Sequence, residues 1–188
     1  MDKNQIRIQY LAKRQRLAPE AAMAACEAIN ASIFTLISGS ATVLAGYRPI
    51  RGEVDVTDAM RRCGESGMRL CLPVIEAPDS PLYFRRWRPG ETLEKGRYGV
   101  DVPPAGAPIA KPDTILVPLV AFDRTGQRLG YGAGYYDRTI RTLRAGEKPP
   151  RVIGVAYAMQ ETAHIPLDSF DEKLDMIVTE NEILRIPS

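Results

Sequence analysis

Short apolar runs rich in β-branched residues alternate along this chain with longer segments in which apolar residues recur every three or four positions. The short runs predict strands over residues 41–47, 68–74, 114–117 and 151–156. The longer segments predict helices over residues 3–17, 19–37 and 57–62, and another that follows Gly134 and stops at Gly146. Strands and helices therefore alternate for most of the chain.

The first two helices have recognisable starts. Asp2 is placed to cap the first helix, with Gln5 three residues later, and Pro19 is placed to begin the second. The apolar positions of the second helix predict a buried face made of Met23, Cys26, Ile29, Ile33 and Leu36. A further strand is expected near residues 83–87, at an edge of the sheet.

A glycine-rich loop separates the strand at 114–117 from the helix that follows it. The loop contains Gly126, Gly130, Gly132 and Gly134. Glycines let backbone N–H groups turn toward one point, and the start of a helix adds unpaired donors and the positive end of its dipole. The layout therefore predicts a site for an anion.

Two charged residues sharpen this prediction. Arg128 lies at the entrance of the loop, where a planar guanidinium can hold phosphate oxygens, and Asp137 lies in the first turn of the helix. A carboxylate repels a phosphate, so the pair makes sense if a Mg²⁺ ion lies between them. The alternative is that Asp137 only complements the helix dipole and the glycines only make turns. Neither G-x-G-x-x-G nor a P-loop motif is present, so neither of those nucleotide folds is indicated.

Composition narrows the function classes. The chain has 188 residues, of which 45% are hydrophobic and 26% charged, and we expect one domain over residues 1–188. The net charge is only +2, and most of the 25 basic residues are arginines spread along the chain. Arginine favours bidentate contacts to small anions, whereas a nucleic-acid surface would be a basic patch with interleaved aromatics. We therefore expect small-molecule ligands and no nucleic acid.

The remaining signals concern the cellular compartment. Cys26, Cys63 and Cys71 lack the pairing of a disulfide framework or a zinc site, so buried thiols are expected. The single histidine, His164, is interpreted as structural. The N-terminal segment is charged, and no apolar run is expected to reach the length of a membrane span. We therefore predict a cytoplasmic monomer with no membrane partner.

The run from Val117 to Arg138, VPLVAFDRTGQRLGYGAGYYDR, resembles the signature of the 5-formyltetrahydrofolate cyclo-ligases, also called methenyltetrahydrofolate synthetases. The resemblance implies a single three-layer α/β domain, with a mostly parallel central sheet and helices on both faces. It also implies an enzyme that uses ATP and Mg²⁺ to close 5-formyltetrahydrofolate into 5,10-methenyltetrahydrofolate. In this family the formyl oxygen is thought to be phosphorylated before the nitrogen at folate position 10 attacks. Phosphate-positioning groups are therefore expected rather than a nucleophile and its base.

The resemblance also assigns residues to ATP and to the metal. Lys3 and Arg7 lie one helical turn apart and match a Lys-x-x-x-Arg that contacts ATP in the family; their spacing alone is equally typical of a solvated face. The other residues expected at ATP are Arg128, Gly130, Gly132, Ala133, Gly134, Tyr135 and Tyr136. Arg128 and Asp137 are expected to be catalytic, and Asp137 and Asp171 to hold Mg²⁺.

The folate is expected beyond the first strand. Tyr47, Arg48 and Glu53 follow the carboxyl end of that strand, where ligands bind in open α/β sheets. The segment Tyr-x-Pro followed by Gly-Glu-Val-Asp resembles the folate-binding segment of the family, in which the glutamate holds the substrate. On its own, Glu53 could equally serve the start of the next helix. The further folate contacts expected are Tyr98, as a stacking partner for the pterin ring, Tyr131 and Tyr135.

Three positions depart from the family pattern. Val102 stands where a glutamate is common, Ala133 where some members have a lysine, and Phe170 where a histidine usually precedes the aspartate. The missing lysine removes one phosphate contact. The competing function is a non-catalytic module that binds a nucleotide or a sugar phosphate through the same glycine loop. Such a module would need the loop but not Glu53.

Overall fold

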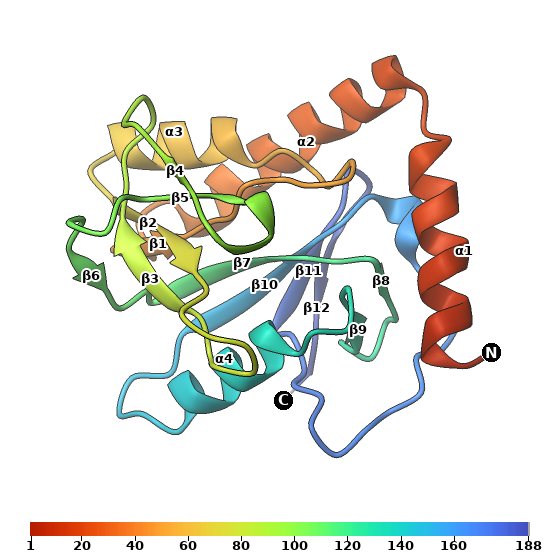
Figure 1. The fold of residues 1–188 in the computed structure, drawn as a ribbon. Coiled ribbons are helices and arrows are strands. Elements are labelled where there is room, and N and C mark those ends of the chain that lie inside the picture. Colours follow the sequence, from red (N-terminus) through yellow and green to blue (C-terminus); the bar gives the residue numbers. More distant parts are fainter. Residues whose placement is uncertain (188) are drawn as a thin grey trace.

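The computed structural model describes residues 1–187 and is built around one eight-stranded sheet (Figure 1). In the order in which they lie side by side, its strands are β12 (Ile183–Arg185), β11 (Met176–Val178), β10 (Arg151–Val155), β7 (Thr114–Pro118), β1 (Val43–Ala45), β2 (Arg69–Val74), β3 (Tyr83–Arg86) and β6 (Ile109–Ala110). The five strands from β11 to β2 are parallel, and the pairs at either side of them are antiparallel. The predicted mostly parallel sheet is confirmed.

Helices cover both faces of this sheet, as predicted. They are α1 (Lys3–Gln15), α2 (Pro19–Ile37), α3 (Thr57–Glu65) and α4 (Tyr135–Arg144). Figure 1 shows α2 and α3 over one face, α4 over the other, and α1 standing beside the sheet. The smaller elements are the two-stranded ribbons of β4 (Glu94–Lys95) with β5 (Asp101–Val102) and of β8 (Ala121–Phe122) with β9 (Arg128–Leu129), and the 3₁₀ turns η1 (Arg97–Gly99) and η2 (Ala158–Gln160).

The core follows from the alternation of side chains along each strand. In β1, Leu44 packs with α2 and α3, whereas Val43 and Ala45 pack on the face that α4 covers. Ile140 of α4 is fully buried on this second face. The central strands are therefore apolar at most positions, because both of their faces are covered.

The order of the strands in the sheet determines where along its edge a ligand can bind. From β1 the chain passes to β2 on one side, whereas from β7 it passes to β10 on the other. Parallel strands whose connections diverge in this way leave a crevice beyond their carboxyl ends. The loops that follow β1 and β7 therefore face each other across that crevice.

Several expectations about the elements are wrong in detail. Met23 of α2 is 73% exposed, and the buried face follows an i, i+4 row through Ala25, Ile29, Ile33 and Ile37. The sequence could not separate the two faces, since alanines make both of them apolar. Strand β3 is not at an edge, because the two-residue strand β6 pairs with its outer side.

The expectation that no apolar run reaches the length of a membrane span is also wrong. By length and composition alone, α2 could cross a membrane. In the structure Ile29, Ile33 and Ile37 have no exposed surface and pack in the core. The apolar composition of α2 thus has a packing role in this fold.

The three cysteines are free thiols in the structure. Cys63 and Cys71 are buried free thiols, as predicted, and Cys26 is partly buried. Burial raises the pKa of the Cys63 thiol to about 11. His164 is exposed and lies in a loop, as its place before Ile165 and Pro166 indicated.

Candidate functional site

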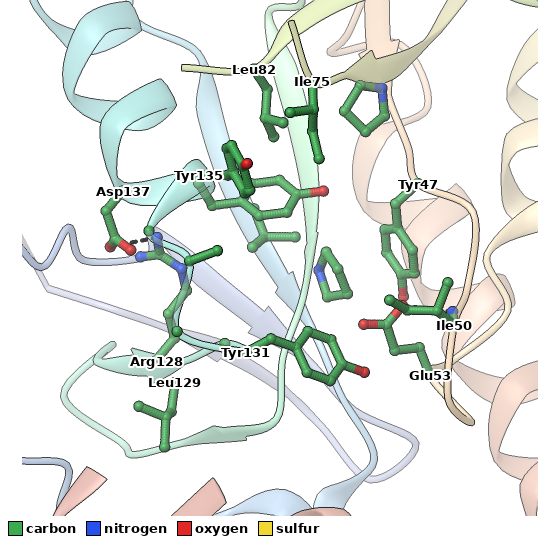
Figure 2. Close-up of a pocket in the computed structure, with 18 of the residues that line it drawn as sticks. Tyr47, Ile50, Glu53, Ile75, Leu82, Arg128, Leu129, Tyr131, Tyr135 and Asp137 are labelled. Carbon is green, nitrogen blue, oxygen red and sulfur yellow. Dashed lines mark hydrogen bonds and ion pairs between the residues drawn. The ribbon is translucent and has the colours of Figure 1, made fainter. Parts of the chain in front are cut away.

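A cavity of about 320 Å³ opens at the crevice between the loops that follow β1 and β7 (Figure 2). The predicted site residues that line it are Lys3, Arg7, Tyr47, Arg48, Glu53, Arg128, Gly130, Tyr131, Gly132, Ala133, Gly134, Tyr135, Tyr136, Asp137 and Asp171. They come from α1, from the loop after β1, from the glycine loop with the start of α4, and from the segment before β11. The fold therefore brings together residues that are far apart in the sequence.

The glycine loop ends in an open helix start. Gly132 and Gly134 have φ angles of 101° and 67°, which side-chain-bearing residues rarely adopt. Gly134 is the N-cap of α4, and no side chain among residues 1–187 caps this end. The first intrahelical bond of this end runs from Arg138 N to Gly134 O, so the preceding N–H groups are available to an anion.

Arg128 and Asp137 form an ion pair beside this helix start. The Nη2 of Arg128 donates to Oδ1 of Asp137 at 2.7 Å, and its Nη1 donates to the carbonyl oxygen of Glu172. The Glu172 N–H donates to the same Asp137 oxygen at 3.2 Å. Burial lowers the pKa of the Arg128 guanidinium, and Asp137 opposes that shift. Both terminal nitrogens of the guanidinium thus have a protein partner in this structure.

Lys3 is also held by carboxylates. Its Nζ lies 2.6 Å from Oδ2 of Asp168 and 2.5 Å from Oδ2 of Asp171. Burial lowers the pKa of Lys3, but the two carboxylates outweigh that effect and raise it above its ordinary value. Because Asp2 caps α1 through the N–H groups of the first turn, the start of this helix is fixed against the cavity.

Arg7 lies one turn further along α1 and contacts the glycine loop itself. Its Nε donates to the carbonyl oxygen of Gly130 at 2.9 Å, and its Nη1 donates to Oδ1 of Asn4 at 2.6 Å. The guanidinium carbon would lie 3.4 Å from a Cβ placed on Gly132. A side chain at Gly132 would therefore crowd the cation against the loop.

The two predicted metal ligands, Asp137 and Asp171, could supply some of the oxygen ligands that Mg²⁺ requires. Asp137 uses Oδ1 and Asp171 uses Oδ2 for the contacts just described, and within residues 1–187 each keeps one oxygen without a protein partner. Both carboxylates lie near enough to Arg128 to oppose the lowering of its pKa by burial. No group of three or more potential metal ligands forms among the described residues. Two carboxylates fit a Mg²⁺ ion whose other ligands are phosphates and water.

Glu53 lies on the opposite side of the cavity (Figure 2). It is 8% exposed, and its Oε2 accepts a hydrogen bond from Ile50 N at 2.9 Å. Burial raises the pKa of Glu53 to about 7, although the Ile50 N–H, Arg14, Tyr131 and Arg51 each oppose the shift. A carboxylate so poised can accept hydrogen bonds from a bound ligand that brings N–H donors.

Two further residues of the loop after β1 complete this side. The hydroxyl of Tyr47 donates to the carbonyl oxygen of Val54 at 2.8 Å, and the ring is buried. Arg48 contacts Thr57 Oγ1 through Nη1 at 3.4 Å, at the start of α3. The loop is therefore braced by its own side chains.

The placement of Tyr98 contradicts its expected role as a stacking partner. Its ring is 72% exposed and lies outside the cavity, with its hydroxyl 3.3 Å from that of Tyr135. The residue has a left-handed backbone with φ of 58° inside η1, which turns its side chain outward. Val102 lines the cavity from this region instead.

Some residues at the cavity were missed by the sequence analysis. Asp168 binds Lys3, and its only signal was a position three residues before Asp171. Arg14 is buried beside Tyr131, and it lies seven residues after Arg7, on the same face of α1. The apolar wall formed by Pro73, Ile75 and Leu82 carried no recognisable pattern.

Comparison with known proteins gives the same picture over the whole chain. The profile of the 5-formyltetrahydrofolate cyclo-ligase family matches residues 1–180. A 5-formyltetrahydrofolate cyclo-ligase of Mycolicibacterium smegmatis is 31% identical over 94% of this chain and 93% of its own, and one of Escherichia coli K12 is 30% identical over 76% and 80%. The solved structure of Aquifex aeolicus 5,10-methenyltetrahydrofolate synthetase aligns with a TM-score of 0.79 and 30% identity, covering 100% of this chain and 94% of that one.

Proposed function

The chain belongs to the 5-formyltetrahydrofolate cyclo-ligase family, and from this premise we propose that it uses ATP to close 5-formyltetrahydrofolate into 5,10-methenyltetrahydrofolate. One observation carries the proposal for this chain. A single cavity joins a glycine loop that suits phosphates to a buried carboxylate that suits a pterin. A module that only bound a nucleotide would not need the second part.

We assign the two sides of the cavity to the two ligands. Figure 2 shows Arg128 and Asp137 on one side, Tyr47 and Glu53 on the other, and Tyr131 between them. The phosphates of ATP suit the first side, where helix N–H groups and cations gather. The amino and ring N–H donors of a reduced pterin suit Glu53, which would repel phosphates.

The reaction we propose proceeds through phosphorylation of the formyl oxygen. That oxygen attacks the terminal phosphorus of ATP, and ADP leaves. The nitrogen at folate position 10 then attacks the formyl carbon and loses its proton, and phosphate leaves with the former formyl oxygen. Catalysis of this kind depends on positioning and on stabilisation of charge, for which Arg128, Lys3 and Arg7 are the candidates.

We propose that Asp137 and Asp171 hold the Mg²⁺ ion that accompanies ATP. When bound, the ion neutralises charge on the phosphates. Lys3 is bonded to one oxygen of Asp171, and Arg128 is bonded to one oxygen of Asp137. The two cations would therefore also orient these metal ligands. We further propose a cytoplasmic monomer without nucleic-acid or membrane partners; the nearly balanced charge supports the absence of a polyanionic partner.

The test of the function is the appearance of methenyltetrahydrofolate absorbance from 5-formyltetrahydrofolate, with and without ATP. We expect turnover that depends on ATP. Glu53→Ala should lose 5-formyltetrahydrofolate binding in calorimetry and bind MgATP as the wild type does, because the glycine loop is unchanged. Glu65→Ala, which removes an exposed carboxylate of α3, is the matched control. A wild type that binds MgATP but no reduced folate would identify a nucleotide-binding module instead.

A further inference from the structure

Arg14 of α1 is a buried cation that the proposed reaction does not use. It is 4% exposed, and none of the ion pairs among residues 1–187 includes it. A buried charge is costly unless its hydrogen-bonding capacity is satisfied. The burial of Arg14 must therefore be explained by the groups to which its guanidinium donates hydrogen bonds.

The guanidinium of Arg14 joins three segments of the chain. Its Nε donates to the carbonyl oxygen of Arg51 at 3.2 Å, and its Nη1 donates to that of Leu119 at 3.1 Å. Its Nη2 donates to the hydroxyl of Tyr131 at 2.6 Å. These partners lie in the turn that carries Glu53, just after β7, and in the glycine loop. One side chain thus connects both sides of the cavity.

The turn that carries Glu53 depends on such support. Arg51 and Gly52 both have positive φ angles, of 49° and 77°, and this conformation is unfavourable for arginine. The Glu53 N–H donates to Ile50 O at 3.0 Å, which closes the turn. The bond from Arg14 to the carbonyl of Arg51 therefore stabilises a backbone that presents Glu53 to the cavity.

Tyr131 connects the same cation to the glycine loop. The guanidinium carbons of Arg14 and Arg51 lie 5.9 Å and 5.2 Å from the centre of its ring. Because Arg14 donates to the Tyr131 oxygen, the hydroxyl proton of Tyr131 remains available to another acceptor. Glu53 lies close enough to raise the pKa of Tyr131. The ring is therefore fixed between the two ligand positions.

We propose that Arg14 is a positioning residue for the reduced folate, which fixes Tyr131 and the Glu53 turn in the arrangement that receives the pterin. The proposal rests on the proposed function, because it concerns the folate side of that site. Arg14 touches neither ligand in this scheme. It acts through the two segments that it joins.

The groups that face Glu53 influence the pH at which this carboxylate ionises, so the role of Arg14 can be tested by the pH dependence of folate binding. Arg14 faces it from α1, Arg51 from its own turn, Tyr131 from the glycine loop, Tyr47 from the end of β1 and Tyr136 from α4. Arg14 and Arg51 are the cations in this set. Burial raises the pKa of Glu53 to about 7, and Arg14 lowers it. Since the ionised carboxylate accepts hydrogen bonds from the pterin, loss of Arg14 should move folate binding to higher pH.

The experiment is calorimetry of 5-formyltetrahydrofolate and of MgATP with Arg14→Met, Arg14→Lys and Tyr131→Phe, between about pH 6 and pH 9. We expect Arg14→Met and Tyr131→Phe to weaken folate binding about tenfold and to raise its pH midpoint by about one unit. Arg14→Lys should weaken binding but keep the midpoint, because it keeps the charge and loses the fork. MgATP affinity should stay within about twofold of the wild type. Arg16→Met removes an exposed cation at the C-cap of α1 and should behave as the wild type.

The outcomes separate this proposal from the function on which it rests. A wild type that binds no 5-formyltetrahydrofolate overturns the proposed function. A wild type that binds it, with variants that keep its affinity and pH midpoint, overturns only the role of Arg14. Equal losses for both ligands would show a general structural role and overturn the positioning role as well. If Arg14→Met does not fold, Arg14→Lys decides, because it keeps the charge and should weaken folate binding only if the guanidinium fork positions Tyr131 and the Glu53 turn.

Discussion

Replacing Glu53 with glutamine should stabilise the protein at alkaline pH while removing folate binding. The carboxylate is 8% exposed, and burial raises its pKa from an ordinary value of 4.5 to about 7. The folded state therefore binds this proton more tightly than the unfolded state does. The resulting stability is complete below about pH 4.5 and is lost as the pH rises through about 7.

The magnitude follows from the size of that shift. Each pKa unit corresponds to about 1.4 kcal/mol, so ionisation of Glu53 lowers the free energy of unfolding by about 3 kcal/mol between pH 4 and pH 8. A glutamine carries no charge, and its amide oxygen can still accept the bond from Ile50 N. A neutral acceptor is weaker by about 1 kcal/mol, which leaves a net gain of about 2 kcal/mol at pH 8.

The assay is thermal unfolding of the wild type and Glu53→Gln at about pH 5 and pH 8. For a chain of this length, the gain corresponds to a rise in Tm of about 4–8 °C at pH 8, with little or no rise at pH 5. Glu65→Gln, in which an exposed carboxylate is neutralised, should show no such pH dependence. An equal change in Tm at both pH values would refute the assignment of the shift to Glu53.

Three further predictions concern the other side of the site and the loop that leads to it. Asp137→Asn should abolish turnover at ordinary Mg²⁺ and cost on the order of 3 kcal/mol in chemical unfolding, because buried Arg128 loses its counter-charge; activity at ordinary Mg²⁺ would contradict the metal role. Arg128→Ala should lower turnover by about 10²–10³ in steady-state kinetics with varied ATP, and a change confined to folate affinity would argue against phosphate contact. Gly126→Ala should destabilise the protein by about 1–3 kcal/mol in urea, because φ is 87° and the new Cβ would lie 2.7 Å from Ile186 Cγ2; an unchanged urea midpoint would show that the turn can relax.

Features determined by neighbouring residues could be predicted from the sequence. The start of α4 at Tyr135 follows Gly134, a glycine that adopts the left-handed backbone found at the N-cap of this helix. The alternation of buried strands and helices likewise predicted the sheet, because apolar periodicity reports directly which faces are covered. The position of Glu53 at the cavity followed from its place beyond a parallel strand.

Features determined by distant contacts could not be predicted in this way. Lys3 meets Asp168, which lies 165 residues further along the chain, and no local pattern records such a pairing. Tyr98 was expected in the cavity, but the direction of its side chain depends on a left-handed backbone within a short turn. Arg14 gave no signal of burial, since a charged residue on an amphipathic helix usually faces water.

The divergence of the chain at β1 and β7 bears on how a site of this kind can evolve. The turn after β1 leads toward β2, β3 and the apolar wall formed by Pro73, Ile75 and Leu82, whereas the glycine loop after β7 leads toward α4 and β10. Residues 80–82 are bonded to α4, because Leu82 N donates to Thr139 Oγ1 at 2.7 Å and Arg138 Nε donates to the carbonyl oxygen of Ser80 at 3.4 Å. Changes that leave the nucleotide side unaltered are therefore confined to the later part of this flank, where Val100 and Val102 line the cavity. A directed-evolution library at Val100 and Val102 should change which reduced folate is accepted while the nucleotide requirement stays the same. Because β1 and β7 lead in opposite directions along the sheet, mutations that alter the folate side can be selected apart from mutations that alter the ATP side.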